Sequence, residues 1–287
     1  MKDSLLNSSF KYCEEIARSH YENFPVASFF IPKEKRKYIF SIYAFARAAD
    51  DFADETGLRS KEDRLNLLEE WNQKLTDCYN GKTYDPIFIA LKKTVNDNKI
   101  PIEPLENLLK AFKQDVEKNR YENFGEVLDY CTNSANPIGR LMLMIFGEQD
   151  ENMLRLSDNI CTALQLTNFW QDVSLDLQKD RIYIPLDDMR HFGYSEEELK
   201  KKILTDNFKK LLKYEIEGTQ KLFDKGKELI ELTKKLNKLK KLSKQLVLTW
   251  HGGTEILKRI KENEYDIFNK RPKLKFIDKF KLLLKLI

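Results

Sequence analysis

Apolar residues recur at helical spacing along almost the whole chain, and this periodicity restricts the fold more than any other feature. The 287 residues include only 10 Gly and 8 Pro, which is few for an α/β or all-β protein of this length. Charged residues make up 33% of the chain and suit exposed helix faces. We find no internal repeat and no convincing pair of strands. The sequence therefore predicts a single all-α domain over residues 1–287, built as a helical bundle.

Helix start and stop signals divide this pattern into segments. A proline in the first turn, a Ser-x-x-Asp capping box and a Gly after the last apolar position are the signals used. Five predicted helical segments have both limits: 8–21, 32–55, 60–79, 150–178 and 205–262, the last with a break at Gly252-Gly253. Three further helices are predicted by their starts alone, near Pro86, near Pro104 and at Ser195. Asn136-Pro137 marks a further break, and residues 181–185 are expected to be extended.

The first candidate site is an acidic cluster at the end of the predicted helix 32–55, with Asp50, Asp51, Asp54 and Glu55 in close succession. On a helix, Asp50 and Asp54 lie one turn apart on the same face, where like charges repel. Acids at a helix C-terminus also oppose the macrodipole. A solvated helix end is the plainer interpretation of one such cluster, but its flanks are too apolar for a solvated surface. We therefore expect a cation beside these carboxylates.

The second candidate site is a polar stripe along the predicted helix 150–178. Gln165, Asn168, Asp172 and Asp176 follow one another at i, i+3, i+7 and i+11, which is one continuous helical face. The other faces are apolar and aromatic. Buried polar groups need partners, so the stripe indicates a polar cavity. A polar seam against a neighbouring helix is the alternative.

Together the two clusters predict facing acidic walls with metal ions between them. Mg²⁺ takes oxygen ligands from one or two carboxylates, and substrate phosphates complete its shell. Such a site binds a diphosphate and assists cleavage of its C–O bond. The candidate metal ligands, which are also the candidate catalytic residues, are Asp50, Asp54, Asp172 and Asp176, with two or three Mg²⁺ ions as the cofactor.

Basic residues near the two clusters are candidate contacts for the diphosphate. They are Arg47, Lys179 and Arg181, and an arginine offers a planar fork for phosphate oxygens. Tyr183, just beyond the second cluster, is a further candidate for the cavity. A tyrosine of the core or of the cavity rim remains the plainer interpretation of that position.

Charge and cysteine usage exclude several classes of function. The formal net charge of +4 balances 50 basic against 46 acidic residues, which is too even to indicate nucleic-acid binding. Four scattered cysteines and three scattered histidines indicate neither a disulfide framework nor a zinc site. The first ten residues lack the apolar region of a signal peptide, and no apolar run reaches the ~18 residues of a spanning helix. We expect a cytoplasmic protein.

The C-terminal segment 273–287 alternates lysines with apolar residues at helical spacing. This pattern is typical of an interfacial helix on anionic lipid, which would place the protein peripherally on the inner face of the membrane. A terminal helix docked on the bundle explains the pattern equally well, and both interpretations stay open.

These motifs resemble the squalene/phytoene synthase family, the head-to-head prenyl synthases, over essentially the whole chain. The strongest matches are residues 43–55 and 164–173, followed by Asp176 and residues 181–185. The resemblance implies an isoprenoid-synthase helical bundle with a central active-site cavity. It also implies Mg²⁺ held by the two aspartate motifs and allylic diphosphate chemistry through carbocations. Ser28, Phe29, Gln165 and Asn168 join the expected substrate-binding residues on the same ground.

Within the family, residues 22–28, 168–172 and 252–257 and the pair Arg271-Pro272 resemble the branch of bacterial hopanoid pathways that contains hydroxysqualene synthases. That resemblance implies conversion of presqualene diphosphate and water to hydroxysqualene, with a presqualene diphosphate synthase as a partner in the pathway and no need for NADPH. Many typical synthases carry Asn-Ile-x-Arg-Asp where this chain has Asn-Phe-Trp-Gln-Asp, so Gln171 replaces a basic residue.

Two alternatives to a hydroxysqualene synthase remain. One is a squalene, dehydrosqualene or phytoene synthase that condenses two farnesyl or geranylgeranyl diphosphates. The other is a non-catalytic helical assembly factor that kept the fold, against which the intact acidic pairs argue.

Overall fold

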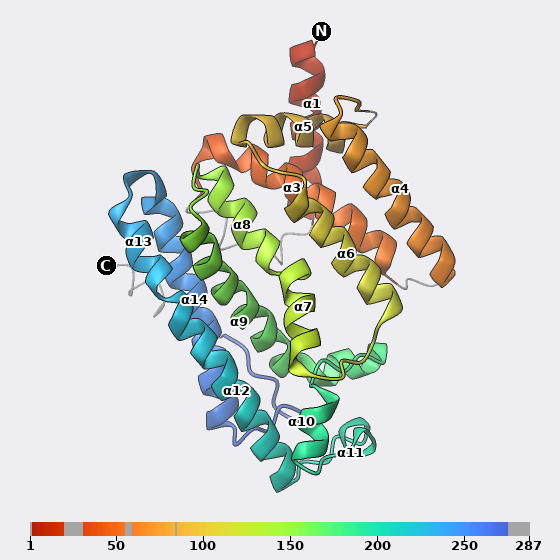
Figure 1. The fold of residues 1–287 in the computed structure, drawn as a ribbon, viewed down its shortest axis with the longest axis vertical. Helices are drawn as coiled ribbons and strands as arrows, with labels where there is room; N and C mark the ends of the chain where they lie inside the picture. The colour runs from red at the N-terminus through yellow and green to blue at the C-terminus, as the bar shows by residue number, and fades with distance from the viewer. Residues whose placement is uncertain (1, 20–30, 55–58, 84, 275–287) are drawn as a thin grey trace.

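The protein is described by a computed structural model in which residues 2–19, 31–54, 59–83 and 85–274 are placed (Figure 1). These residues form helices joined by short loops, with one isolated bridge between Arg120 and Ile182. The helices are α1 Lys2–Ser19, α3 Lys33–Ala53, α4 Lys61–Tyr79, α5 Pro86–Asn98, α6 Glu103–Glu117, α7 Phe124–Ser134, α8 Asn136–Ile145, α9 Glu151–Asp176, η2 Leu177–Lys179, α10 Leu186–His191, α11 Glu196–Lys200, α12 Asp206–Gly226, α13 Glu228–Lys235, η3 Asn237–Leu239 and α14 Lys240–Glu262. The prediction of an all-α fold is confirmed.

Most helix boundaries follow from local chemistry that the sequence displays. Ser60 caps α4: its hydroxyl accepts the Asp63 N–H at 3.0 Å, while the Asp63 carboxylate accepts the Ser60 N–H at 3.1 Å. Pro86 begins α5 and Pro137 lies in the first turn of α8, where a missing N–H costs nothing. The main difference at the N-terminus is that α1 begins at Lys2, earlier than the expected residue 8.

The expected break at Gly252-Gly253 is wrong, because α14 runs through both glycines without interruption. A Cβ on Gly253 would lie 2.4 Å from Cζ of Phe223 and 3.0 Å from Cδ2 of Leu164. Gly253 therefore lets α14 approach α9 and α12 closely. The chain breaks instead around Lys227 and between Leu236 and Leu239.

Helix α9 lies between two groups of helices (Figure 1). It packs against α7 and α8 on one side and against α12, α13 and α14 on the other. The indole N–H of Trp170, a fully buried residue, donates to the Thr219 hydroxyl at 2.8 Å and ties α9 to α12. Because its apolar faces are covered in this way, α9 holds its polar stripe in a fixed direction.

The extended segment 181–185 follows the end of α9 and lies alongside the loop after α6. The Ile182 N–H donates to the Asn119 carbonyl and the Leu186 N–H to the Tyr121 carbonyl, both at 2.9 Å. This pairing satisfies the backbone of a buried segment without a sheet. It also brings the segment after α9 next to the last turn of α6, where Arg181 donates to the Asp115 carbonyl. Within the described ranges, no helix has both the length and the apolarity needed to cross a bilayer.

A buried carboxyl group on α12 makes the stability of the fold depend on pH. Burial, and then the neighbouring Asp188, raises the pKa of Glu215 from 4.5 to about 9. The folded protein therefore keeps a proton that the unfolded chain releases above pH 4.5, so stability is lost as the pH rises from about 4.5 towards 9. Asp187, Asp188 and His191 of α10 are the neighbouring ionisable groups.

Glu215→Gln, which mimics the protonated side chain, is expected to stabilise the protein at pH 8 by on the order of 2 kcal/mol and to change little at pH 4.5. Urea unfolding at the two pH values measures the difference. The exposed Glu217→Gln on the same helix is the matched control and should leave the pH dependence unchanged. An equally steep loss of stability in Glu215→Gln would contradict the assignment.

Candidate active site

The first acidic cluster lies at the C-terminal end of α3. This helix ends at Ala53, and Asp54 takes the capping position with its N–H donating to the Asp50 carbonyl at 2.9 Å. Asp50 and Asp54 are half-buried, whereas Asp51 is exposed. Arg47 donates to the Asp50 carboxylate at 2.9 Å and also contacts Asp51. One arginine thus partly offsets three carboxylates at a helix end that already carries negative dipole charge.

The electrostatics of this cluster indicate room for more positive charge. Burial raises the pKa of Asp50, and the charge of Asp54 raises it further, against the smaller opposing effects of Arg47 and Lys179. Within the described chain, the buried Nε of Arg47 has no hydrogen-bond acceptor. The site therefore has both an under-compensated carboxylate pair and one buried donor without a described acceptor.

The second cluster lies on the last three turns of α9, as the stripe predicted. Gln165, Asp172 and Asp176 are half-buried and Asn168 is exposed. The residues between them face the core: Leu166, Phe169, Trp170 and Val173 are all buried. Burial, and then the charge of Asp172, raises the pKa of Asp176 to about 7, while Arg181, Lys179 and Arg271 oppose the shift.

Lys179 connects the two clusters electrostatically. It lies in η2, immediately after α9, and its charge lowers the pKa of both Asp50 and Asp176. The carboxyl group of Asp115 on α6 also lies within the field of Asp50 and Asp54 on one side and of Arg181 on the other. The ends of α3, α6 and α9 therefore converge, and the acidic residues expected from the sequence face a common region.

Arg271, which the sequence analysis did not assign to the site, contacts the second cluster directly. Its Nε and Nη2 donate to the two carboxylate oxygens of Asp172 at 2.5 and 2.9 Å. Next to it, the Gln171 amide donates to the Pro272 carbonyl at 2.5 Å. The segment after α14 thus returns to the end of α9. A basic residue after the last helix was visible in the sequence, but nothing there indicated which helix it would contact.

An aromatic cluster stands behind the second acidic cluster. The rings of Tyr183 and Phe169 stack with their centroids 3.7 Å apart, and Tyr121 and Tyr130 pack around Tyr183 at 5.4 and 5.8 Å. Tyr183 is 8% exposed, so it belongs to this packed cluster beside Arg181. The plainer sequence interpretation, a tyrosine of the core, describes its burial correctly.

Asp115 is a second residue that the sequence analysis missed. Its carboxylate accepts the Tyr130 hydroxyl at 3.0 Å, and its backbone carbonyl accepts from Arg181 at 3.2 Å. Burial raises the pKa of Asp115 to about 6, against the opposing charge of Arg181. Because it sits alone in an ordinary amphipathic helix, no spacing in the sequence singled it out.

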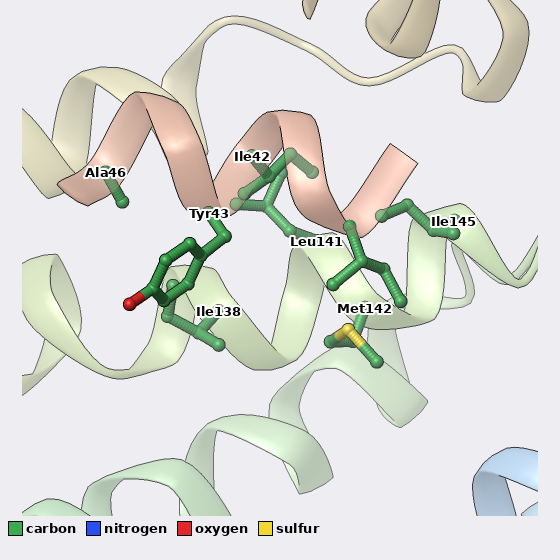
Figure 2. A pocket seen from close by; sticks show the side chains of 8 residues that line it. Ile42, Tyr43, Ala46, Ile138, Leu141, Met142 and Ile145 are labelled. Carbon is green, nitrogen blue, oxygen red and sulfur yellow. The ribbon is translucent and has the colours of Figure 1, made fainter. Parts of the chain in front are cut away.

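A small apolar pocket lies between α3 and α8 (Figure 2). Its volume is about 120 Å³, and its α3 wall includes Ala46 and Tyr43, one turn before the Arg47–Asp50 pair. The remaining lining residues are Ile39, Ile42, Ile138, Leu141, Met142 and Ile145. The pocket follows α3 away from the acidic end and offers an apolar chain a path between the two helices.

The donor set suits Mg²⁺ that shares its shell with a phosphate. In the described part of the chain, no three His, Cys, Asp or Glu side chains come together as a complete metal site. Each aspartate pair offers one or two carboxylates, which is what Mg²⁺ takes from a protein when phosphates and water supply the rest. The guanidinium of Arg271 on Asp172 and the raised pKa of Asp50 both indicate a demand for positive charge here. Asp50, Asp54, Asp172 and Asp176 therefore fit such an ion.

Some expected site residues fall outside the described residues. Ser28 and Phe29 belong to the segment 20–30, Glu55 to 55–58, and most of the tail 273–287 to 275–287. Of the other candidates, Arg47, Lys179, Arg181, Gln165 and Asn168 all lie on the helix ends, or on the segments adjoining them, that carry the two acidic clusters.

Comparison with known proteins identifies relatives along most of the chain. The model of the squalene/phytoene synthase family matches residues 17–278. A hydroxysqualene synthase of Zymomonas mobilis is 42% identical over 176 residues, which cover 60% of this chain and 57% of that protein. A chloroplastic phytoene synthase of an Oncidium hybrid cultivar is 27% identical over 273 residues, 93% of this chain. The match spans only 65% of that phytoene synthase.

Among solved structures, the fold is similar to that of the squalene synthase HpnC from Alicyclobacillus acidocaldarius. The two chains share 37% identity with a TM-score of 0.85. The match covers 91% of this chain and 96% of that one.

Proposed function

The chain belongs to the squalene/phytoene synthase family, and from that premise we propose that it converts presqualene diphosphate and water to hydroxysqualene and diphosphate. The observation that carries the proposal is the convergence of two acidic clusters, with Lys179 between them, on a region flanked by aromatic rings and an apolar pocket. A prenyl diphosphate needs both kinds of surroundings, because its diphosphate is charged and its prenyl chain is apolar. The substrate would come from a presqualene diphosphate synthase.

The charged end of the substrate would lie between α3 and α9. Asp50, Asp54, Asp172 and Asp176 would hold Mg²⁺, which when bound supplies positive charge against the leaving diphosphate. Arg47, Lys179 and Arg181 would donate to diphosphate oxygens directly. Its pairing with Asp50 holds the guanidinium of Arg47 at the acidic end of α3.

The reaction breaks the C–O bond of presqualene diphosphate, with the electron pair leaving on the diphosphate. The cyclopropylcarbinyl cation opens, water adds to it, and loss of a proton gives the alcohol. The stacked faces of Phe169 and Tyr183 would lower the energy of a nearby cation through their ring quadrupoles. Asp115, whose pKa is raised to about 6, offers an acceptor for the released proton.

Two features favour water capture over condensation of two farnesyl diphosphates. One is the 42% identity with a hydroxysqualene synthase over 176 residues. The other is Gln171, which occupies a position that is basic in many typical synthases and whose amide is engaged by the Pro272 carbonyl. The matches to phytoene synthases favour the alternative, a condensing synthase.

Product analysis decides between the two. The purified full-length chain is incubated with Mg²⁺ and presqualene diphosphate, farnesyl diphosphate or geranylgeranyl diphosphate, each with and without NADPH. We expect hydroxysqualene from presqualene diphosphate alone, with the hydroxyl oxygen labelled in ¹⁸O-water and no effect of NADPH. A C30 or C40 hydrocarbon from farnesyl or geranylgeranyl diphosphate would instead establish the condensing synthase.

The pocket between α3 and α8 is expected to bind part of the prenyl chain. Ala46→Phe would fill much of this small pocket from its α3 wall and should raise KM for presqualene diphosphate about tenfold, because displaced chain atoms lose their apolar burial. Steady-state kinetics measure the change, and inhibition by inorganic diphosphate should be unaltered. Ile138→Ala, which enlarges the same pocket, is the opposing variant. An unchanged KM in Ala46→Phe would place the prenyl chain elsewhere.

A further inference from the structure

A basic groove lies at the end of the bundle opposite the acidic clusters. It has a volume of about 610 Å³ and lies between the first turn of α3 and the start of α14. Its charged lining residues are Lys33, Arg36, Lys240, Lys241 and Lys244. Arg36 and Asp50 are 14 positions apart on α3, so the groove is about 20 Å from the acidic site along this helix. In Figure 1 the start of α3 and the end of α9 lie at opposite ends of the bundle.

The positive charge of this groove is not neutralised by the described chain. No acidic side chain is among its lining residues, and none of its five basic residues forms an ion pair with a described carboxylate. A second hollow, of about 370 Å³, shares Lys33 and Arg36 and adds Lys11, Arg18 and Lys37. Its single acid, Glu14, is paired with Arg18 at 2.6 Å. The basic surface therefore extends from α14 across α3 to α1.

The sequence around the start of α14 keeps this charge on the outside. Residues 234–244 contain six lysines and no acid. Between the lysines, Leu239 and Leu242 are buried and Leu236 is half-buried, while Lys240, Lys241 and Lys244 are exposed. Lys234 and Lys238 are paired with Glu231 and Glu148, whereas Lys240, Lys241 and Lys244 have no described carboxylate partner. The start of α14 thus has an apolar side packed on the bundle and a cationic side facing outwards, which is the charge pattern of segments that bind anionic membranes.

The exposure of the groove's basic side chains favours binding to an extended anionic surface over binding to a single small anion. Four of its five basic residues are exposed, and the fifth, Arg36, already donates to the Ile31 carbonyl at 3.0 Å. No buried, unpartnered polar atom among the described residues belongs to the groove. A site built for one phosphate would hold buried donors aimed at it. Dispersed lysines instead suit the many headgroups of a bilayer.

The apolar pocket extends along α3 towards the same end of the bundle as the basic groove. Ile39 lines the pocket about one turn after Arg36 on α3. Ile145 lines the same end of the pocket from α8, and its carbonyl accepts from the Lys35 ammonium. We propose that the basic groove docks the protein on anionic phospholipid, with the far end of the apolar pocket next to the membrane. The benefit, release of an apolar product into lipid, rests on the proposed function, but the docking itself does not.

Vesicle sedimentation of the full-length protein tests the docking without any turnover. We expect binding to phosphatidylcholine vesicles that contain phosphatidylglycerol, weakening as salt is added, and little binding to phosphatidylcholine alone. Lys240→Glu/Lys241→Glu/Lys244→Glu should lower the partition coefficient for the anionic vesicles by roughly a hundredfold or more. Each lysine near an anionic surface adds to the attraction, and each glutamate in its place is repelled.

The matched control is Lys61→Glu/Lys110→Glu/Lys210→Glu, which makes the same change in net charge at exposed positions on α4, α6 and α12. It should retain binding close to that of the unmodified chain. Equal losses in both triple variants would show a net-charge effect and overturn the groove assignment. So would undiminished binding of the groove variant, or equal binding of the unmodified protein to neutral and anionic vesicles. Activity measured in detergent reports separately on the proposed function.

Discussion

Asp172→Ala is expected to lower kcat/KM for presqualene diphosphate by roughly a thousandfold or more while the protein stays folded. Asp172 is half-buried at the end of α9, and its carboxylate is one of two that this helix presents to the diphosphate region. Under the proposed function its removal would take away a ligand for Mg²⁺, and it leaves Arg271 without its 2.5 and 2.9 Å partner. Charge that stabilises the leaving diphosphate is then lost in the transition state.

Steady-state kinetics and calorimetry of Mg²⁺-dependent diphosphate binding measure this effect. Asp172→Asn, which keeps the shape and loses the charge, should be nearly as inactive and should also bind diphosphate weakly. Asp129→Ala, at an exposed position on the neighbouring α7, is the control and should retain activity. Normal turnover by a folded Asp172→Ala protein would remove the second acidic cluster from the active site.

Gly253→Ala is expected to destabilise the protein by about 1 to 3 kcal/mol, the opposite of what an ordinary helical glycine would give. In a helix interior, replacing Gly by Ala normally stabilises by up to about 1 kcal/mol. At Gly253 the new Cβ would lie 2.4 Å from the Phe223 ring, itself fully buried, so the packing of α14 on α12 must shift. The steric cost therefore exceeds the gain in helix propensity.

Gly252 provides the matched control one position earlier on the same helix. Among the residues that the structure describes, a Cβ there meets only Cδ1 of Leu274, at an ordinary contact distance of 3.6 Å. Gly252→Ala should therefore be neutral or stabilise the protein slightly. Chemical denaturation of the two variants measures the contrast. Stabilisation by both substitutions would mean that α14 does not pack as closely on Phe223 as described.

The glycine pair also shows where sequence reasoning fails for this fold. Adjacent glycines lower helix propensity and therefore predict a break at 252–253, which α14 does not have. The capping box at Ser60 and the prolines at 86 and 137 were interpreted correctly because each acts through its own backbone within one turn. Gly253 acts through a ring 30 positions earlier in the chain, which no local rule detects.

The residues of the candidate site also fall into those that local spacing predicts and those that only the tertiary structure brings together. The stripe that ends at Asp172 and Asp176 was recognisable because helical spacing alone puts those residues on one face. Asp115, Tyr130 and Arg271 were not, because each reaches the site from a different helix or loop. Arg271 and Asp172 are 99 positions apart, and only the return of the chain after α14 brings them together.

The sequence by itself determined the all-α class, most helix limits and the two acidic clusters, because periodicity, capping and spacing are properties of neighbouring residues. It also carried the resemblance that the family match confirmed. Only the tertiary structure decided that the two clusters share the field of Lys179, that an aromatic cluster stands behind one of them, and that a basic groove lies at the far end of α3. Those relations depend on how the helices pack, and packing is fixed by burial and contacts between residues far apart in the chain.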